Sequence, residues 1–269
     1  MSLASELRSR AKDAAEPEHK VLVLDIENGP NIAAVWALWD QNISTDMIHE
    51  SSSVICFAAK WLGDDEVFFF SDFHDGHEAM IEAAWTLLDD ATAVIHYNGD
   101  AHDIKHLNRE FLLAKMSPPR PYKNIDLLKT MRQRFKFPSN KLDYVAQRLG
   151  VGKKVKHPGY TMWKDAIYGT PVEKAAAWAL FKVYNIGDIY LTEDVYTAVL
   201  SWISNHPVVH VAKDIDVPTC YKCGSDELSD EGVEIVGAYI YQAYVCLGCN
   251  SWLRGTTNLG KIANTKLTK

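Results

Sequence analysis

The sequence predicts an α/β layered domain over roughly residues 18–205, followed by a small separate unit near the C-terminus. Two observations predict the domain. Four consecutive apolar residues within Lys20–Glu27 are typical of a strand buried on both faces, and strand-like runs then alternate with segments of helical periodicity. The small unit is predicted by four of the five cysteines, which form two Cys-x-x-Cys pairs beyond residue 215.

The elements follow in chain order. After the first strand, we expect strands at Ala34–Asp40, Val54–Leu62, Glu66–Phe70, Ala93–Tyr97 and Asn124–Leu128, where apolar, aromatic or β-branched residues cluster. Helices are expected at Gly76–Asp90, Asp103–Lys115 and Lys141–Leu149. A capping box with proline at the first helical position, Thr170-Pro-Val-Glu173, begins the longest helix. We expect this helix to reach about Ile203 with a break or bend.

The composition excludes several classes of protein. The 269 residues are 47% hydrophobic and 23% charged, which excludes collagen-like and disordered chains. There is no apolar run of roughly 18 residues, so we expect no membrane span, and the polar N-terminus lacks the apolar core of a secretory signal. We therefore expect a cytoplasmic protein, with residues 1–17 as a lead-in to the domain.

Asp25 and Glu27 end the first strand and, two residues apart, point to the same face. Adjacent carboxylates repel each other and resist burial, so they favour a bound cation. Oxygen ligands alone favour a hard ion such as Mg²⁺ or Mn²⁺. The pair by itself is weak evidence, because strands often end in polar residues.

Asp103 opens the helix that follows the strand at Ala93–Tyr97 and the turn at Asn98-Gly99. An N-cap is the simplest interpretation of this aspartate, although Asp100 is a second candidate for that role and would leave Asp103 free for another one.

Tyr184 and Asp188 lie one turn apart on a face of the longest helix. Asn185 and Gly187 between them are poor helix formers, so something other than helix propensity accounts for their presence.

In this order, LDIE, YNGDAHD and YNIGD resemble the three exonuclease motifs of the DnaQ-like 3′–5′ exonucleases, which have the ribonuclease H-like fold. The tyrosine four residues before the last aspartate matches the DEDDy branch, which includes the proofreading domains of family B polymerases. The stretches IDLLK and PSNKLD are closer to stand-alone phage and prokaryotic exonucleases. The resemblance covers roughly residues 20–205 and implies a mixed five-stranded sheet with helices on both faces.

Two residues depart from the family pattern. His102 stands where an aromatic residue usually precedes the second-motif acid, and Asn28 stands where threonine often follows the first-motif glutamate. Neither change removes a metal ligand. His102 would alter local packing or contact the substrate.

The resemblance implies that Asp25, Glu27, Asp103 and Asp188 hold two Mg²⁺ or Mn²⁺ ions and that Tyr184 positions the attacking water. A pair of divalent ions can lower the pKa of water and stabilise the attacking and leaving oxygens of a phosphodiester. Tyrosine, with an ordinary pKa of about 10, is a poor base at neutral pH, so orienting the water is the role we expect.

Positive charge is concentrated in one stretch although the net charge is −7. Nine Lys or Arg stand between Lys129 and His157 against one acid, Asp143, so the stretch carries +8 and the rest of the chain −15. Charge alone fits a solvated face, but a basic strip beside the carboxylates would bind a polyanion. The expected substrate contacts are Asn98, Lys141, Lys153, Lys154, Lys156 and His157.

Cys220, Cys223, Cys246 and Cys249 form two knuckles 22 residues apart, and between them Gly232–Tyr244 alternates like a hairpin that turns near Gly237. This pattern is typical of a zinc ribbon, in which four thiolates hold one structural Zn²⁺. Free or redox-active thiols are the alternative. Aromatic residues of the ribbon, Tyr239, Tyr241, Tyr244 and Trp252, would either stack on bases or form its small core, and Arg254, Lys261, Lys266 and Lys269 add positive charge.

The sequence therefore predicts a lead-in at 1–17, an exonuclease domain at 18–210, a zinc ribbon at 215–256 and a basic tail at 257–269. The expected activity is metal-dependent 3′–5′ exonuclease action on DNA, preferred over RNA, with a replication or repair protein as a partner in trans. We expect the protein in the cytoplasm; if a phage encodes it, this would be the cytoplasm of the host cell. The alternatives are an endonuclease or ribonuclease on the same fold, or a non-catalytic nucleic-acid-binding adaptor.

Overall fold

The computed structural model describes residues 20–210 and 217–262. The expected lead-in and the end of the expected basic tail, with Lys266 and Lys269, lie outside these ranges. In the part of the chain described, no helix is both long enough and apolar enough to cross a lipid bilayer.

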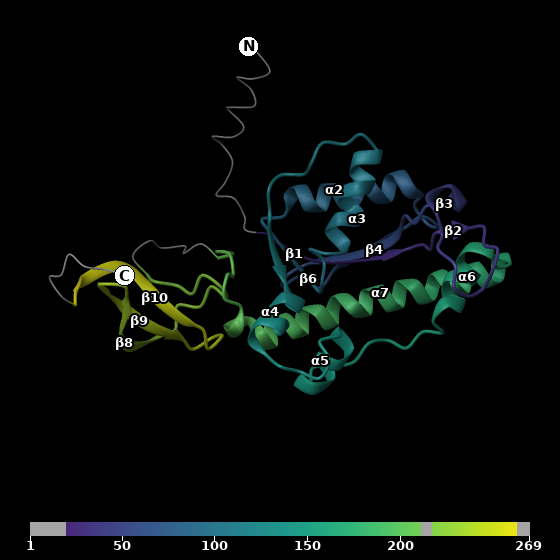
Figure 1. The fold of residues 1–269 in the computed structure, drawn as a ribbon. Helices are drawn as coiled ribbons and strands as arrows, with labels where there is room; N and C mark the ends of the chain where they lie inside the picture. Colours follow the sequence, from purple (N-terminus) through teal and green to yellow (C-terminus); the bar gives the residue numbers. More distant parts are fainter. Residues whose placement is uncertain (1–19, 211–216, 263–269) are drawn as a thin grey trace, which may run out of the picture.

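A five-stranded mixed sheet lies at the centre of the larger part of the molecule, with strand order β5-β4-β1-β6-β7 (Figure 1). The strands are β1 (Val21–Asn28), β4 (Val54–Trp61), β5 (Val67–Ser71), β6 (Ala93–His96) and β7 (Lys123–Asp126). β1 pairs antiparallel with β4 and parallel with β6, so the strand that carries the first acidic motif is central. The mixed five-stranded sheet expected from the sequence is confirmed.

Helices cover both faces of the sheet (Figure 1). On one face, α2 (His77–Asp90) and α3 (Asp103–Leu113) pack on Leu22, Leu24 and Ile26 of β1. On the other face, α4 (Leu127–Arg134), α5 (Leu142–Leu149) and α7 (Pro171–Val199) pack on Val21 and Val23. Because side chains alternate along a strand, Asp25 and Glu27 share the α7 side.

α7 is a single helix of 29 residues, and its N-terminus has the predicted capping box. The Thr170 side chain accepts a hydrogen bond from the Glu173 backbone N–H, and the Glu173 carboxylate accepts one from the Thr170 N–H at 2.7 Å. The expected break or bend is wrong: helix continues through Asn185 and Gly187 to Val199, and a short 3₁₀ turn, η2 (Leu200–Trp202), follows it. Burial of one face of the helix against the sheet outweighs the low helix propensity of these two residues.

The strand expected at Ala34–Asp40 is also wrong. Those residues belong to a loop between β2 (Ile32–Ala33) and β3 (Ile48–Glu50), which pair only with each other; a 3₁₀ turn, η1 (Thr45–Met47), precedes β3. Alternating apolar residues imitate a strand, but Trp36 is 93% exposed, so no sheet buries this segment. Two helices were not predicted: α4, which begins after the shorter β7, and α6 (Tyr160–Tyr168), which packs beside the start of α7.

The C-terminal unit is a three-stranded antiparallel sheet, with β9 (Tyr239–Cys246) between β8 (Leu228–Val236) and β10 (Trp252–Lys261). The predicted hairpin is confirmed, with its turn at Gly237, where φ is +62°. This unit contacts the end of α7 directly. The buried Lys222 ammonium donates hydrogen bonds to the carbonyl oxygens of Leu200 at 3.1 Å and Ile203 at 2.8 Å.

Candidate active site and cysteine cluster

The first acidic motif and the third meet where α7 crosses the C-terminal half of β1. Asp25 and Glu27 lie opposite Ala58 and Cys56 of β4 and point to the α7 side of the sheet. Among the described residues, carboxylate oxygens of Asp25, Glu27 and Asp188 lie within 4.8 Å of one another. The structure therefore brings together two motifs that are 160 residues apart in the sequence.

Asn185 joins this cluster from the helix. Its Nδ2 atom donates to Oδ2 of Asp25 at 2.7 Å and to the Asp25 carbonyl oxygen at 3.3 Å. Asn185 is fully buried, so these bonds explain an asparagine in a helix interior. The sequence showed that the residue was unusual, but its contact with Asp25 depends on the helix crossing the strand.

Gly187 is explained by close packing. A Cβ atom at this position would lie 2.9 Å from Cγ2 of Val155, which belongs to the loop between α5 and α6. Only glycine allows the loop to approach α7 this closely, and the approach brings Lys154 to the carboxylates.

Asp103 occupies a different position from the other three acids. It is the first residue of α3 and is buried, and its Oδ1 accepts a hydrogen bond from the Ile26 N–H at 3.1 Å. Its contact is therefore with the β1 backbone between Asp25 and Glu27. The negative charge of Asp103 is second only to burial in raising the pKa of Asp25.

Burial raises the pKa values of all four acids, and at Asp25 and Glu27 the charges of neighbouring acids raise them further. For Asp25, burial is the largest cause, followed by the charges of Asp103 and Asp188. The pKa of Glu27 is raised to about 8, mainly by burial and then by the charge of Asp188. Burial is also the largest cause for Asp103 and Asp188. The site thus holds more negative charge than its surroundings stabilise, which is the condition that favours a cation.

One oxygen of Asp188 is unsatisfied. Asp188 is only 1% exposed, and its Oδ1 atom is buried. This atom has no hydrogen-bond partner among the described residues. A buried carboxylate oxygen without a donor costs free energy that a cation would offset. An oxygen-only donor set with an unpaired buried oxygen fits a hard divalent ion.

Lys154 reaches into the site. Its ammonium donates to Oδ2 of Asp188 at 2.5 Å and to the Tyr184 hydroxyl at 3.1 Å. Burial lowers the pKa of Lys154, but the attraction and hydrogen bond of Asp188 outweigh it and raise the pKa above its ordinary value. This lysine was expected to contact phosphate; in the structure it contacts Asp188 and Tyr184 and remains a cation at neutral pH.

Tyr184 lies beside Asp188 as its spacing predicts, and only 7% of it is exposed. Burial, followed by the charge of Asp188, raises the pKa of its hydroxyl to about 12. The hydroxyl is therefore neutral at physiological pH and can donate or accept a hydrogen bond. It cannot serve as a base there.

Aromatic residues support Tyr184 from the side of α6. The ring of His157 lies 4.7 Å from that of Tyr184 and 5.6 Å from that of Trp163. Trp163 in turn donates its indole N–H to the carbonyl oxygen of Asn28 at 2.9 Å. His157 was expected to contact substrate; in the structure it packs between these rings. The support from α6 was missed because that helix was not predicted.

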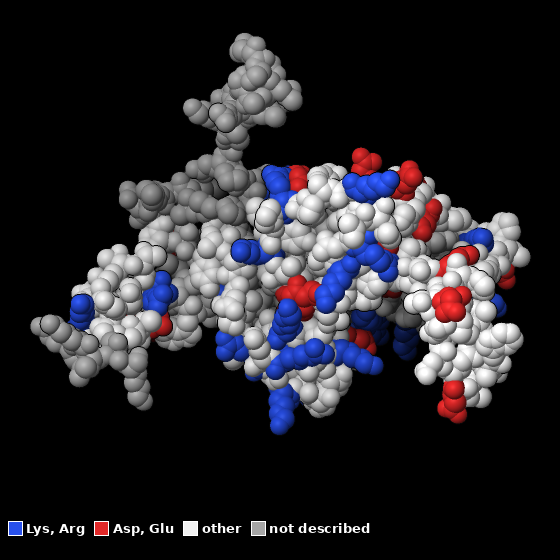
Figure 2. Space-filling view, turned by 45° about the horizontal axis from the view of Figure 1, so that its top comes forward, with Lys and Arg blue, Asp and Glu red and all other residues white. Residues whose placement is uncertain are grey.

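A groove of about 540 Å³ opens beside Asp25. Asn98 and Lys141, both expected substrate contacts, line it together with Arg132, Asn140 and Lys154. Lys153 and Lys156 are exposed on the loop after α5 and do not line this groove. Arg132 and Asn140 were not singled out from the sequence, although Arg132 was one of the residues of the basic strip. Figure 2 shows Lys and Arg side chains gathered over the lower middle of the molecule, where α4 and α5 lie.

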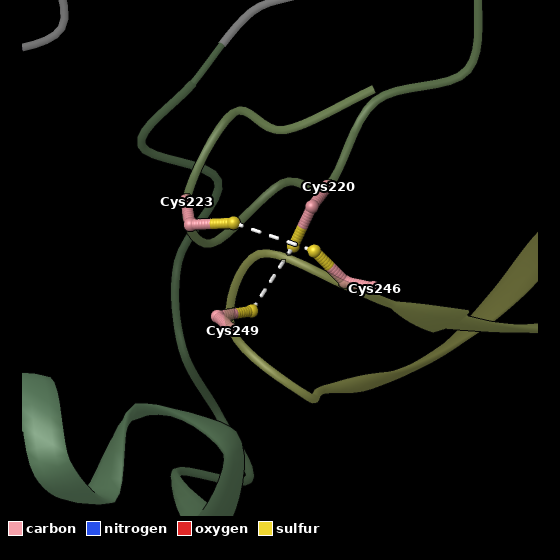
Figure 3. Close-up of side chains that lie close together, drawn as sticks. All are labelled: Cys220, Cys223, Cys246 and Cys249. Carbon is pink, nitrogen blue, oxygen red and sulfur yellow. Dashed lines mark hydrogen bonds between the residues drawn. The ribbon is translucent and has the colours of Figure 1, made fainter. Parts of the chain in front are cut away.

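The four cysteines converge, as their spacing predicts (Figure 3). Sγ of Cys220 lies 3.7 Å from that of Cys249, and Sγ of Cys223 lies 3.5 Å from that of Cys246. These separations are too long for disulfides, but they are close to the ~3.8 Å edge of a tetrahedron with Zn–S bonds of ~2.3 Å. The donor set and its geometry therefore fit one structural Zn²⁺.

Comparison with known proteins agrees with the fold. The family model described as the RNase_H superfamily matches residues 42–199. No curated protein matches the sequence. Among solved structures, the family B DNA polymerase from the hyperthermophilic archaeon Pyrobaculum calidifontis is similar, with a TM-score of 0.51 and 17% sequence identity.

That similarity covers 70% of this chain but only 25% of the polymerase, so it concerns one part of a much larger protein. At this identity it shows a shared fold alone. The family model covers more than half of the chain, and the mixed sheet with its acidic cluster agrees with it. The protein belongs to the RNase H superfamily.

Proposed function

We propose that this protein is a metal-dependent 3′–5′ exonuclease that acts on DNA. One observation carries the proposal: the oxygens of Asp25, Glu27 and Asp188 lie within 4.8 Å of one another beside a groove lined by basic side chains. A phosphodiester strand is an anion, and its hydrolysis needs positive charge at the scissile phosphate and an activated water.

Asp25, Glu27 and Asp188 would hold divalent ions, with Asp103 as the fourth acid of the set. Two bound Mg²⁺ or Mn²⁺ ions would lower the pKa of the attacking water and stabilise the negative charge that develops on the oxygens of the phosphodiester. Lys154 and a divalent ion compete for the carboxylate of Asp188. Lys154 is therefore placed to move between that acid and a substrate phosphate.

Other residues position the reacting groups. Asn185 fixes the orientation of the Asp25 carboxylate through its hydrogen bond of 2.7 Å. Tyr184, neutral at physiological pH, orients the attacking water through its hydroxyl. Asn98, Arg132 and Lys141 line the groove and would hold the strand by its phosphates and sugars, which would make the enzyme tolerant of sequence.

The direction of digestion and the preference for DNA are supported by the order and spacing of the three motifs, which resemble those of the DEDDy exonucleases. An endonuclease or ribonuclease would use the same carboxylates, and an adaptor would bind strands without cutting them. A replication or repair protein acting in trans is a further part of the proposal.

Digestion of oligonucleotides labelled at the 3′ or the 5′ end, as DNA and as RNA, tests the proposal. With Mg²⁺ or Mn²⁺, we expect early release of a mononucleotide from the 3′-labelled DNA and a ladder of shortening products from the 5′-labelled DNA. Excess EDTA and Asp188→Asn should each abolish cleavage. Asp194→Asn, on the exposed side of the same helix, is the matched control.

Cleavage at internal positions first, or faster cleavage of RNA than of DNA, would replace the proposal with the corresponding alternative. Binding without any cleavage would favour the adaptor.

A further inference from the structure

The loop formed by residues 34–44, here called the tryptophan loop, carries large apolar side chains in solvent. Trp36 is 93% exposed, Leu38 85% and Trp39 83%. Scattered exposed apolar residues are ordinary, but two tryptophans and a leucine within four positions form a patch of the kind that binds a partner. The acidic site described above does not use this patch.

The tryptophan loop is held by its own hydrogen bonds. The Oε1 atom of Gln41 accepts from the backbone N–H groups of Trp36 at 2.7 Å and Ala37 at 2.8 Å. At the base of the loop, the Ala34 N–H donates to the Met47 carbonyl oxygen at 2.9 Å. A loop ordered in this way presents its side chains without a large loss of entropy when it binds.

The loop emerges from the end of the strand that carries the acids. β1 ends at Asn28, and β2 begins at Ile32, directly before the loop. The Gly29 N–H is fixed to the Ser53 carbonyl oxygen at 2.9 Å, and the Asn28 carbonyl oxygen is fixed to Trp163 of α6. In Figure 1 the loop and α6 lie at the same end of the molecule, beyond β2 and β3.

The charge of the loop separates it from the basic groove. Residues 34–44 contain one acid, Asp40, and no Lys or Arg. In Figure 2 this end of the molecule is a mostly white lobe with a few Asp and Glu side chains, whereas Lys and Arg side chains gather over α4 and α5. A polynucleotide presents phosphates on one side and flat, weakly polar bases on the other. The basic groove suits the phosphates, and the tryptophan loop suits only the bases.

We propose that Trp36 and Trp39 stack on the unpaired bases of a single strand whose 3′ end lies at Asp25, Glu27 and Asp188. The inference rests on the proposed nuclease function and narrows its substrate to single strands or frayed ends. Aromatic side chains stack on every base, so the loop adds affinity without reading sequence.

The test is binding of a fluorescently labelled single-stranded oligodeoxynucleotide, with Ca²⁺ in place of Mg²⁺ to suppress cleavage. The Trp36→Ala/Trp39→Ala double variant should bind at least about fivefold more weakly than the wild type, since stacking contributes of the order of 1–3 kcal/mol per base. The slope of log affinity against log salt should not change, because no phosphate contact is lost. Leu112→Ala/Leu113→Ala, which removes two exposed apolar side chains of α3 that belong to neither the basic groove nor the tryptophan loop, is the matched control.

A second oligonucleotide of the same length, with abasic sites in place of the bases next to the 3′ end, isolates stacking from the other contacts. Wild type and double variant should bind it equally. Equal affinity of the two proteins for the intact oligonucleotide would overturn the inference and leave the tryptophan loop as a protein-binding surface. An equal loss for intact and abasic strands would also overturn it, because the loss would then not depend on bases.

Failure of the inference is distinguishable from failure of the proposed function. If the wild type neither binds nor cuts nucleic acid, the proposed function is wrong and this inference falls with it. If the wild type binds and cuts while the double variant binds as tightly, only this inference is wrong.

Discussion

Nδ2 of Asn28 lies 3.1 Å from Nε2 of His102, so the end of β1 is joined to the residue that precedes α3. These are the two positions at which the motifs depart from the pattern of the DnaQ-like exonucleases. The departures form a single contact and are therefore coupled: each residue supplies the partner of the other. The contact links Asn28, which follows Glu27, to His102, which precedes Asp103, and so connects two of the acids through their neighbours.

We expect that coupling to be measurable. Asn28→Thr and His102→Phe should each lower the free energy of unfolding, because each removes the hydrogen bond between these two side chains. The double variant, which restores the usual family residues, should be less destabilised than the sum of the single variants by about 0.5–1.5 kcal/mol. Urea unfolding of the four proteins measures this difference. Strict additivity would show that the contact contributes nothing.

A second prediction concerns the pH dependence of stability. Because the pKa of Glu27 is raised from 4.5 to about 8, the folded state binds this proton more tightly than the unfolded state does. The resulting stabilisation is complete below pH 4.5 and is lost as the pH rises towards 8. The raised pKa values of Asp25, Asp103 and Asp188 act in the same direction.

Urea unfolding from pH 5 to 8, in dialysed buffer without added Mg²⁺ or Mn²⁺, should therefore show a steady fall in stability. Glu27→Gln should make this fall in the free energy of unfolding smaller, and Asp194→Asn should leave the fall unchanged. Added Mg²⁺ or Mn²⁺ should also make the fall smaller. Stability that rises with pH over this range would contradict the assignment of these acids as a mutually repelling, buried cluster.

The third prediction concerns the basic groove. Arg132 and Lys141 line the groove beside Asp25, so we expect both to contact phosphates of the substrate. Each lost contact should reduce the slope of log affinity against log salt by about 0.7 for a single strand. The Arg132→Ala/Lys141→Ala variant should therefore bind with a slope lower by about 1.4.

The matched control is Lys105→Ala, an exposed lysine of α3 on the opposite face of the sheet. An unchanged slope in the double variant would mean that these residues form only a solvated face and that the strand binds elsewhere. Lys153→Ala/Lys156→Ala measures in the same assay what the exposed loop residues contribute.

The fourth prediction couples the cysteine cluster to the nuclease fold. Lys222 stands between Cys220 and Cys223 and donates to the Leu200, Ser201 and Ile203 carbonyl oxygens at the end of α7. Cys223 and Cys249 also pack against the apolar core on the α7 side of the sheet. Because the two parts share these contacts, loss of zinc should destabilise the larger part as well as the ribbon.

Elemental analysis should find one zinc per chain. Its removal should lower the temperature of the main unfolding transition, and Lys222→Met should lower the free energy of unfolding by about 1–3 kcal/mol. Residues 1–210 alone should still fold, with reduced stability, since they retain both faces of the sheet. Two separate unfolding transitions would show that the two parts are uncoupled, provided that the temperature of the larger transition does not change when zinc is removed.

Much of the fold could be predicted because its signals are local. The buried strand β1, the capping box at Thr170 and the hairpin at Gly237 each follow from a few neighbouring residues, and all three are present. The spacing of Tyr184 and Asp188 was enough to place them on one face of a helix. The cysteine spacing likewise predicted the convergence of the four sulfur atoms.

The rest depends on contacts between distant segments. The alternation in Ala34–Asp40 is identical to that of a strand, and only the lack of a neighbouring sheet edge makes it a loop. Charge placed Lys154 in a basic strip, but its hydrogen bond to Asp188 exists because Gly187 allows the loop close to α7. The contact between Asn28 and His102 joins segments 74 residues apart, and no local pattern shows it.

The continuity of α7 limits how the length of this protein can vary. The helix packs beside α6 near its start, holds Tyr184 and Asp188 at its middle and receives Lys222 after its end. Each residue inserted into an α-helix turns everything beyond it by about 100°. A single insertion between Trp178 and Tyr184 would therefore rotate either the acids away from β1 or the α6 contact away from its partner. Insertions and deletions in related chains should accordingly fall in connections outside the site, such as that between α3 and β7, and leave the interior of this helix unchanged in length.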